Sequence, residues 1–278
     1  MTPVVVGLLL LAALLHASWN AFLRSGKDRL WTVVVMCTMA AAVSLAAVFV
    51  LPKPGISSWP FIGLSALLEI TYCLLLVTAY EHGELAHVYP LARGVSPLLV
   101  TVGAMAFAHE TPSAMTWIGV VLVSSGILSL SAAQDRQGFG PTLFALATGV
   151  VVASFTLLDG VGVRLSGQPQ SYAAWLFLLQ GAPMPFIYVI ARKRLWPAIH
   201  FRETGRAMTA GLVSMTAYAL VLWALNLGSI GPVAALRETS ILFALVIGRV
   251  LLGERVMARR VASAATIAVG AFVLAARG

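Results

Sequence analysis

The feature that most constrains the fold is a series of long apolar segments separated by short polar breaks. A helix needs about 20 apolar residues to cross the roughly 30 Å hydrocarbon core of a bilayer. We expect ten such spans, at residues 3–23, 31–51, 58–80, 86–107, 113–132, 140–162, 171–191, 206–226, 232–252 and 258–276. No connecting segment is long enough for a soluble domain. The sequence therefore predicts an all-α integral membrane protein with ten transmembrane helices.

Composition supports a membrane protein over a nucleic-acid-binding one. Charged residues make up 10% of the chain, against about 25% in soluble domains. The net charge of +8 comes from basic residues in short loops, with no basic face that carries aromatic platforms. We therefore expect the lipid bilayer, and no nucleic acid, as a partner. The two cysteines lack metal-ligand spacing, so neither a metal site nor a cofactor is expected.

The fourth expected span carries a charge inside the sequence PLARGVSP, where Arg93 lies between Pro90 and Pro97. A charge at that depth costs about 2.5–3.5 kcal/mol on insertion scales, so it has to face protein or water. The two prolines favour an interrupted helix, which is tolerated at membrane depth where it is buried or lines a cavity.

A similar stretch returns in the ninth span as LRETS, with Arg237 in the place of Arg93. Glu110 follows Arg93 by seventeen positions, and Glu254 follows Arg237 by the same number. The pattern indicates two related halves, residues 1–134 and 138–278, with five spans each. An odd number of spans makes the second half enter from the opposite face, which gives inverted repeats. Such repeats place the substrate site near the bilayer midplane.

Three short motifs add a resemblance to a known family. They are HASWNAF around Trp19, AHE ending at Glu110 and LGE ending at Glu254. With ten spans in two halves, the chain resembles the EamA family of the drug/metabolite transporter superfamily over essentially its whole length. The first half departs from the usual motif by reading AHE. The resemblance implies a secondary transporter of small metabolites, such as amino acids or related carboxylates, that works by alternating access.

The distribution of lysine and arginine predicts the orientation of the chain in a cell (inner) membrane. Twelve of these residues fall in the odd-numbered loops, and three fall on the other side. Because loops rich in lysine and arginine stay in the cytoplasm, both termini are expected outside.

Polar and aromatic residues inside the spans are the candidate substrate-binding residues, since such groups are costly in a bilayer and mark solute pathways. They are His16, Trp19, Asn20, Glu69, Tyr72, Tyr89, Arg93, Ser96, Asp159, Tyr218, Trp223, Arg237, Glu238 and Ser240. They predict a central cavity walled by the first, third, fourth, sixth, eighth and ninth spans.

Two interpretations of the charged candidates stay open. Arg93 and Arg237 would bind an anionic or zwitterionic solute bidentately, or form structural ion pairs. In the second case the expected partner of Arg93 is Glu69, and those of Arg237 are Glu238 or Asp159. Glu69 and Asp159 would carry protons during transport, or neutralise the arginines.

Other functions are also compatible with the sequence. Two arginines fit a permease for phosphonates or other anionic metabolites. A structural or sensory membrane subunit would leave the matched arginines unexplained. An intramembrane lipid enzyme would need a nucleophile with a base, or metal ligands, at matched depth. The chain contains no GxSxG, HExxH or phosphate-loop pattern, so we expect no catalytic residues and no enzyme activity.

Overall fold

The computed structural model describes residues 1–24, 28–81, 85–131, 139–193, 201–251 and 257–277, and no strand occurs within these ranges. The elements are α1 (Pro3–Arg24), α2 (Arg29–Val50), the short 3₁₀ turn η1 (Ile56–Ser58), α3 (Trp59–Glu81), α4 (Leu85–Phe107), α5 (Ala114–Ser131), α6 (Phe139–Ser166), α7 (Pro169–Gly181), α8 (Met184–Arg192), α9 (Phe201–Leu227), α10 (Ile230–Arg237), α11 (Ser240–Leu251) and α12 (Ala258–Arg277).

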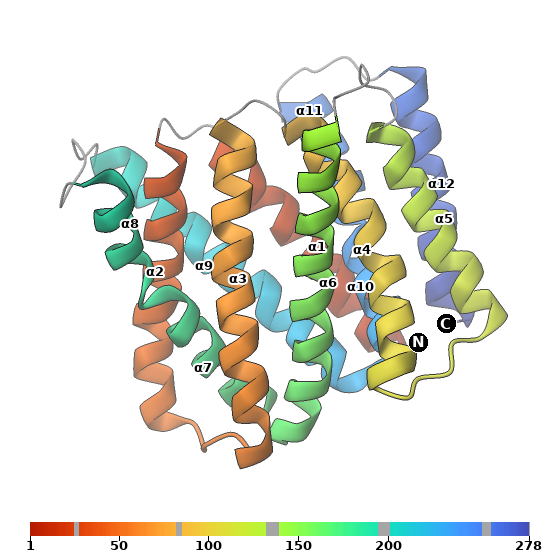
Figure 1. Ribbon diagram of the computed structural model, residues 1–278. Helices are drawn as coiled ribbons and strands as arrows, with labels where there is room; N and C mark the ends of the chain where they lie inside the picture. The colour runs from red at the N-terminus through yellow and green to blue at the C-terminus, as the bar shows by residue number, and fades with distance from the viewer. Residues whose placement is uncertain (25–27, 82–84, 132–138, 194–200, 252–256, 278) are drawn as a thin grey trace.

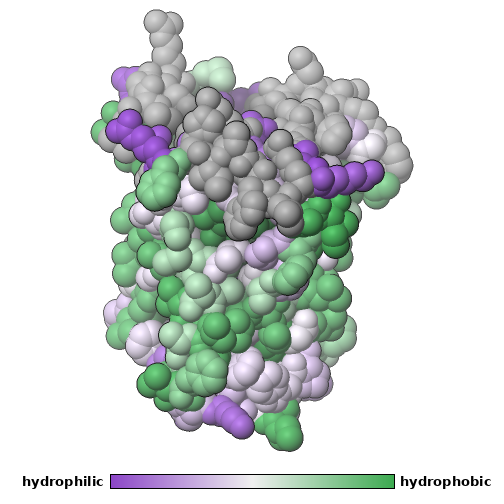
Figure 2. Space-filling view, turned by 90° about the vertical axis from the view of Figure 1, so that its left-hand side faces the viewer, coloured by the Kyte–Doolittle hydropathy of each residue, from purple (hydrophilic) through white to green (hydrophobic). Residues whose placement is uncertain are grey.

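The described helices confirm the prediction of an all-α membrane protein. Nine helical segments among the described residues are long and apolar enough to cross a bilayer, and a tenth, Ala114–Leu130, is apolar but shorter. The seventh and ninth expected spans each consist of two helices, α7 with α8 and α10 with α11. On the face shown in Figure 2, hydrophobic residues predominate over the middle, and the most hydrophilic of the coloured residues lie toward the upper and lower ends.

Helix packing follows a pattern of matched pairs. α1 packs on α9 as α6 packs on α3, while α2 pairs with α7 and α5 pairs with α12. Both chain ends lie at the same end of the bundle, here called the termini face (Figure 1). The opposite end, at which α1, α3, α5, α8 and α11 end, is the loop face. This arrangement is what two five-span halves of opposite orientation produce.

Two glycines at corresponding positions of the two halves, Gly126 on α5 and Gly270 on α12, lie in the interface between these helices. A Cβ on Gly126 would lie 2.7 Å from Cγ1 of Ile267, and one on Gly270 would lie 2.8 Å from the backbone nitrogen of Val123. The hydroxyl groups of Ser129 and Ser263 lie 2.6 Å apart across the same interface. Lipid tails are as apolar as these helices, so close packing and such polar contacts hold them together.

The expectation of a helix interrupted at Arg93 was wrong. α4 continues through Pro90 and Pro97, and the interruption falls in the other half, between Arg237 and Ser240. There the amides of Glu238 and Thr239 donate to carbonyls three residues back, and the hydroxyl of Thr239 also donates to the Leu236 carbonyl. Short polar side chains compete in this way with regular helical bonding, which explains a break without proline.

Two glycines allow α2 to approach α7 and α9 closely. A Cβ on Gly181, at the end of α7, would lie 2.2 Å from the carbonyl oxygen of Cys37. One on Gly211, in α9, would lie 2.6 Å from the carbonyl oxygen of Met36. Since both neighbours are backbone atoms, they have little freedom to move aside.

We expect Gly181→Ala to destabilise the protein by about 1–3 kcal/mol, the usual cost of overpacking. Thermal unfolding of the detergent-purified protein measures the effect. Gly205→Ala is the matched control, because a Cβ there meets nothing within 4 Å, and alanine favours an exposed helix. Equal stability of the two variants would show that α2 and α7 are not packed this closely.

Candidate functional site

A cavity of about 120 Å³ lies between the helices. Its walls come from eight helices, α1, α2, α3, α4, α6, α7, α9 and α10. The lining residues begin at about the middle of the bundle and end at Trp19, Val33 and Leu76. Each of these three residues lies within about one and a half turns of the end of its helix at the loop face. The cavity therefore extends from the midplane toward the loop face.

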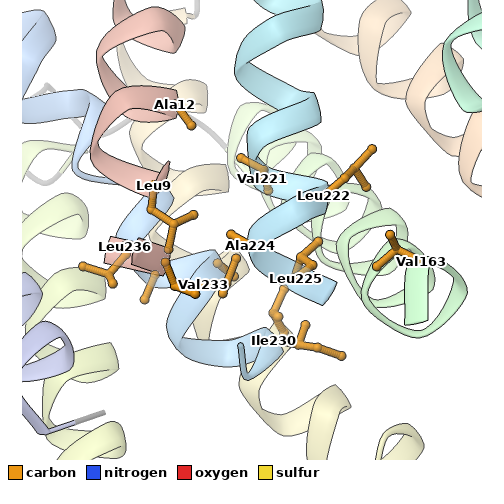
Figure 3. Packing of buried hydrophobic residues seen from close by; sticks show 14 of the residues in the cluster. Leu9, Ala12, Val163, Val221, Leu222, Ala224, Leu225, Ile230, Val233 and Leu236 are labelled. Atoms are coloured by element: carbon orange, nitrogen blue, oxygen red, sulfur yellow. The ribbon is translucent and has the colours of Figure 1, made fainter. Parts of the chain in front are cut away.

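An apolar cluster closes the cavity on the other side. Ala12 and Val221 line the cavity and belong to this cluster. Below them, Leu9, Leu225 and Val233 are fully buried where α1, α9 and α10 meet (Figure 3). A layer of close-packed aliphatic side chains leaves no path for a polar solute, so the termini face is closed in this conformation.

The predicted arginines come together around one carboxylate. Nε of Arg93 lies 2.7 Å from Oε2 of Glu238, and Nε of Arg237 lies 3.7 Å from Oε1 of the same residue. The shorter contact is poorly aligned for a hydrogen bond, so we describe it as an ion pair. The Arg93 guanidinium also lies over the ring of Tyr89, 5.8 Å from its centroid. Two buried cations thus share one buried anion.

The expected pairing of Arg93 with Glu69 does not form, and Glu238 occupies that position instead. Arg237 meets Glu238, which was one of its two expected partners. The Glu238 carboxylate reaches Arg93 because the break after α10 places residue 238 beside α4. Sequence spacing within the ninth span does not reveal this contact between the halves.

A second polar cluster surrounds Asp159 on α6. Its carboxylate accepts hydrogen bonds from Tyr172 on α7, at 2.9 Å, and from Tyr218 on α9, at 2.5 Å. Asp159 is fully buried, and Tyr218 carries the cluster to the cavity wall, where Glu69 also lies. These contacts tie α6, α7 and α9 together, so Asp159 has a structural role.

The structure separates the fourteen predicted site residues into three groups. Those that line the cavity are His16, Trp19, Glu69, Tyr72, Arg93, Tyr218 and Arg237. Those that contact lining residues from behind are Tyr89, Asp159 and Glu238. Those outside these two groups are Asn20, Ser96, Trp223 and Ser240.

Local geometry explains the residues placed away from the cavity. Asn20 donates to the carbonyl of His16 in its own helix, at 2.9 Å. Trp223 is 45% exposed on the outside of α9. Five residues along a helix turn the side chain by about 140°, so Trp223 cannot share the face of Tyr218. Ser96 and Ser240 are buried but do not line the cavity.

Sequence reasoning missed the second and seventh spans, whose residues complete the cavity wall. α2 contributes Cys37, and α7 contributes Phe177 and Gln180. The only feature of the sequence that could have indicated this contribution was Gln180, a side-chain amide inside an apolar segment. Nε2 of Gln180 donates to the sulfur of Cys73 on α3, at 3.8 Å.

Glu110 links the two halves at the termini face. Its carboxylate accepts the backbone N–H of Ile230, at 3.0 Å, and pairs with Nη2 of Arg164 at 2.9 Å. Arg164 also donates to the carbonyls of Leu225 and Gly228. Glu110 thus caps the first turn of α10, the helix whose other end carries Arg237. Its repeat counterpart, Glu254, lies outside the described residues.

We expect Glu110→Gln to destabilise this conformation by about 1 kcal/mol. The amide keeps the shape of the side chain but loses both the attraction to a helix N-terminus and a partly exposed ion pair. Thermal unfolding measures the loss. Glu203→Gln, which removes one acid from the first turn of α9, is the matched control and should change stability by less. An equal loss in both variants would contradict a specific role for Glu110 in holding α10.

The comparisons with known proteins agree with this architecture. The sequence model of the EamA-like transporter family matches residues 4–132 and again residues 141–276. An uncharacterized transporter in the cobO 3'region of Sinorhizobium sp is 32% identical over 102 residues, which are 36% of this chain and 71% of that protein. A solved crystal structure, described only as that of a protein, superposes with a TM-score of 0.76 at 17% identity. The superposition covers 98% of this chain and 96% of the other, and it supports the fold alone.

The two family matches together span almost the whole chain, one on each side of the break between α5 and α6. The paired helix packing, the central cavity and these matches lead to the same conclusion: the chain belongs to the EamA-like transporter family.

Proposed function

We propose that this protein is a secondary transporter of small zwitterionic or anionic metabolites, such as amino acids or related carboxylates. The observation that carries the proposal is the pair of guanidinium groups at the cavity wall, Arg93 and Arg237, which share the carboxylate of Glu238. Nε of Arg237 has no hydrogen-bond partner among the described residues. A bound carboxylate would supply one, because guanidinium recognises this group bidentately.

The two arginines have different tasks in this proposal. Arg93 lies close to Glu238 and over the ring of Tyr89, so its position is fixed from two sides. Arg237 lies a full ångström farther from the same carboxylate and next to the break between α10 and α11. Arg237 is therefore the substrate-binding cation, and Arg93 mainly holds Glu238 in place.

Other lining groups fit a zwitterion. Glu69 offers a carboxylate for a substrate ammonium group, while Phe155, Phe177 and Met215 offer an apolar surface. Two ring nitrogens at the wall, Nε2 of His16 and Nε1 of Trp19, have no hydrogen-bond partner among the described residues. Buried polar atoms without partners are costly, and a polar solute would supply the missing partners.

The orientation proposed from the basic loops makes the loop face cytoplasmic, with both termini outside a cell (inner) membrane. The cavity of this conformation then extends toward the cytoplasm. Alternating access would close that side and open the cluster around Leu9, Leu225 and Val233. Inverted halves, residues 1–134 and 138–278, provide such a pair of related conformations.

We further propose that Glu69 exchanges a proton with the solvent during transport. In proteoliposomes that contain wild-type protein, a pH gradient should drive accumulation of the solute. Glu69→Gln should reduce this accumulation at least about tenfold, because an amide cannot carry the proton, and the solute exchange that remains should no longer respond to the pH gradient. A Glu69→Gln variant that accumulates solute as the wild type does would exclude this role.

The proposal is tested by thermal unfolding of the purified protein with amino acids, other carboxylates, phosphonates and neutral drugs. A ligand at 100 times its dissociation constant adds about 2.7 kcal/mol to stability. Protection by amino acids or carboxylates is the expected result. Protection only by neutral drugs would contradict an anion-binding site.

A permease for phosphonates or other strongly anionic metabolites is the second candidate. It is favoured by Nη2 of Arg93, a buried donor with no hydrogen-bond partner among the described residues. A phosphonate carries more charge than a carboxylate and would engage both arginines at once. Protection by phosphonates, with none by zwitterionic amino acids, would select this candidate. We propose no enzymatic activity and no cofactor for either candidate.

A further inference from the structure

Two cysteines from neighbouring helices lie close together in the cavity wall. Cys37 on α2 and Cys73 on α3 both line it, both are free thiols, and both are partly exposed. Their side chains interact with one another. Both also lie against the same turn of α7, because the Cys73 sulfur is near Nε2 of Gln180 and the Cys37 carbonyl lies against Gly181. The chain contains two cysteines in all.

The helices that carry these thiols have different main packing partners and share α7. α2 packs mainly against α7 and α9, whereas α3 packs mainly against α6 and less extensively against α7. Direct contact between α2 and α3 is limited in comparison, and their cysteines line the cavity between them. A covalent bond between the two sulfur atoms would therefore fix α2 to α3 and would block any conformational change that separates these two helices.

We propose that Cys37 and Cys73 form an oxidisable dithiol whose disulfide holds the protein with its cavity open toward the loop face. The oxidant is a peroxide that enters through the cavity. One thiolate attacks the peroxide oxygen and becomes a sulfenic acid, with release of water from hydrogen peroxide. The second thiol displaces the sulfenic oxygen as a second water and forms the disulfide. Two thiols are oxidised and one peroxide is reduced.

The first part of the experiment tests the modification without any transport assay. Purified wild-type protein is treated with hydrogen peroxide, and free thiols are counted in denaturant before and after. We expect the count to fall from two to none, a non-reducing peptide map to join the Cys37 and Cys73 peptides, and dithiothreitol to reverse both changes. Thiols that stay reduced, or that end as separate sulfinic acids, would overturn the proposal.

The second part tests the conformational consequence, which rests on the proposed alternating access. Hydrogen–deuterium exchange is followed at the amides around Ile230, where Glu110 caps α10 on the termini face. Oxidation should slow this exchange at least tenfold, because opening of that face is blocked. The single variants Cys37→Ser and Cys73→Ser should show no slowing with peroxide. A disulfide that forms and leaves exchange unchanged would overturn the lock.

A third measurement separates this proposal from the proposed function. Uptake of tritiated valine into proteoliposomes is compared for reduced and oxidised protein. Uptake that is lost on oxidation and restored by dithiothreitol supports the lock. Absence of valine uptake by the reduced protein counts against the proposed amino-acid substrate, while the thiol count and the exchange rates still decide the disulfide and its lock.

Discussion

Glu238→Gln is expected to destabilise the folded protein by about 3–5 kcal/mol, the usual cost of removing one partner from a buried ion pair. Glu238 is fully buried, and both Arg93 and Arg237 lie against its carboxylate. Because glutamine has nearly the same shape as glutamate, the loss of stability would come from the lost negative charge. Two buried cations then lose the carboxylate that they share. Thermal and denaturant unfolding of the detergent-purified protein measure the change.

A double variant provides the control for this prediction. Arg93→Met together with Glu238→Leu replaces the shorter ion pair by apolar side chains, which is often neutral or stabilising. The double variant should therefore be more stable than Glu238→Gln. Wild-type stability of Glu238→Gln would show that the arginines do not depend on this carboxylate, and the assignment of Arg93 to structure would then be wrong.

Arg237→Gln is expected to weaken binding of the carboxylate solute by about ten- to a hundredfold or more. Hydrogen bonds to charged groups contribute about 1.5–3 kcal/mol each, and 1.4 kcal/mol is a factor of ten in affinity. Arg237→Lys should recover only part of the loss, because lysine keeps the charge but not the bidentate geometry. Solute-dependent thermal shifts or calorimetry measure the affinities.

Two further variants make this result specific. Arg206→Gln removes an exposed cation near the start of α9 and should leave affinity unchanged. Arg93→Gln should mainly lower stability, since Arg93 is the closer partner of Glu238. Full affinity in Arg237→Gln would remove Arg237 from the binding site and leave both arginines as structural residues.

Sequence reasoning predicted the spans, the paired halves and the lining arginines because each depends on local or periodic information. Apolar length sets a span, and a charge within it has to face protein or water. The same reasoning placed Tyr218 and Arg237 among the candidates, and both line the cavity.

Contacts between distant helices were beyond that reasoning. The meeting of Glu238 with Arg93 depends on how α10 ends against α4, which no spacing along the chain encodes. The contributions of α2 and α7 were missed because Cys37 and Phe177 resemble ordinary apolar residues of a span. The two prolines also led the prediction to place the helix interruption in the wrong span, since α4 accommodates Pro90 and Pro97 within a continuous helix.

The most direct test of the central claim is counterflow in proteoliposomes loaded with the solute that best protects the purified protein. Radiolabelled solute added outside should accumulate transiently with wild-type protein, and Arg237→Gln should reduce this accumulation at least tenfold under the same conditions. Wild-type protein that binds the solute but shows no counterflow would contradict transport and favour a sensory or structural membrane subunit.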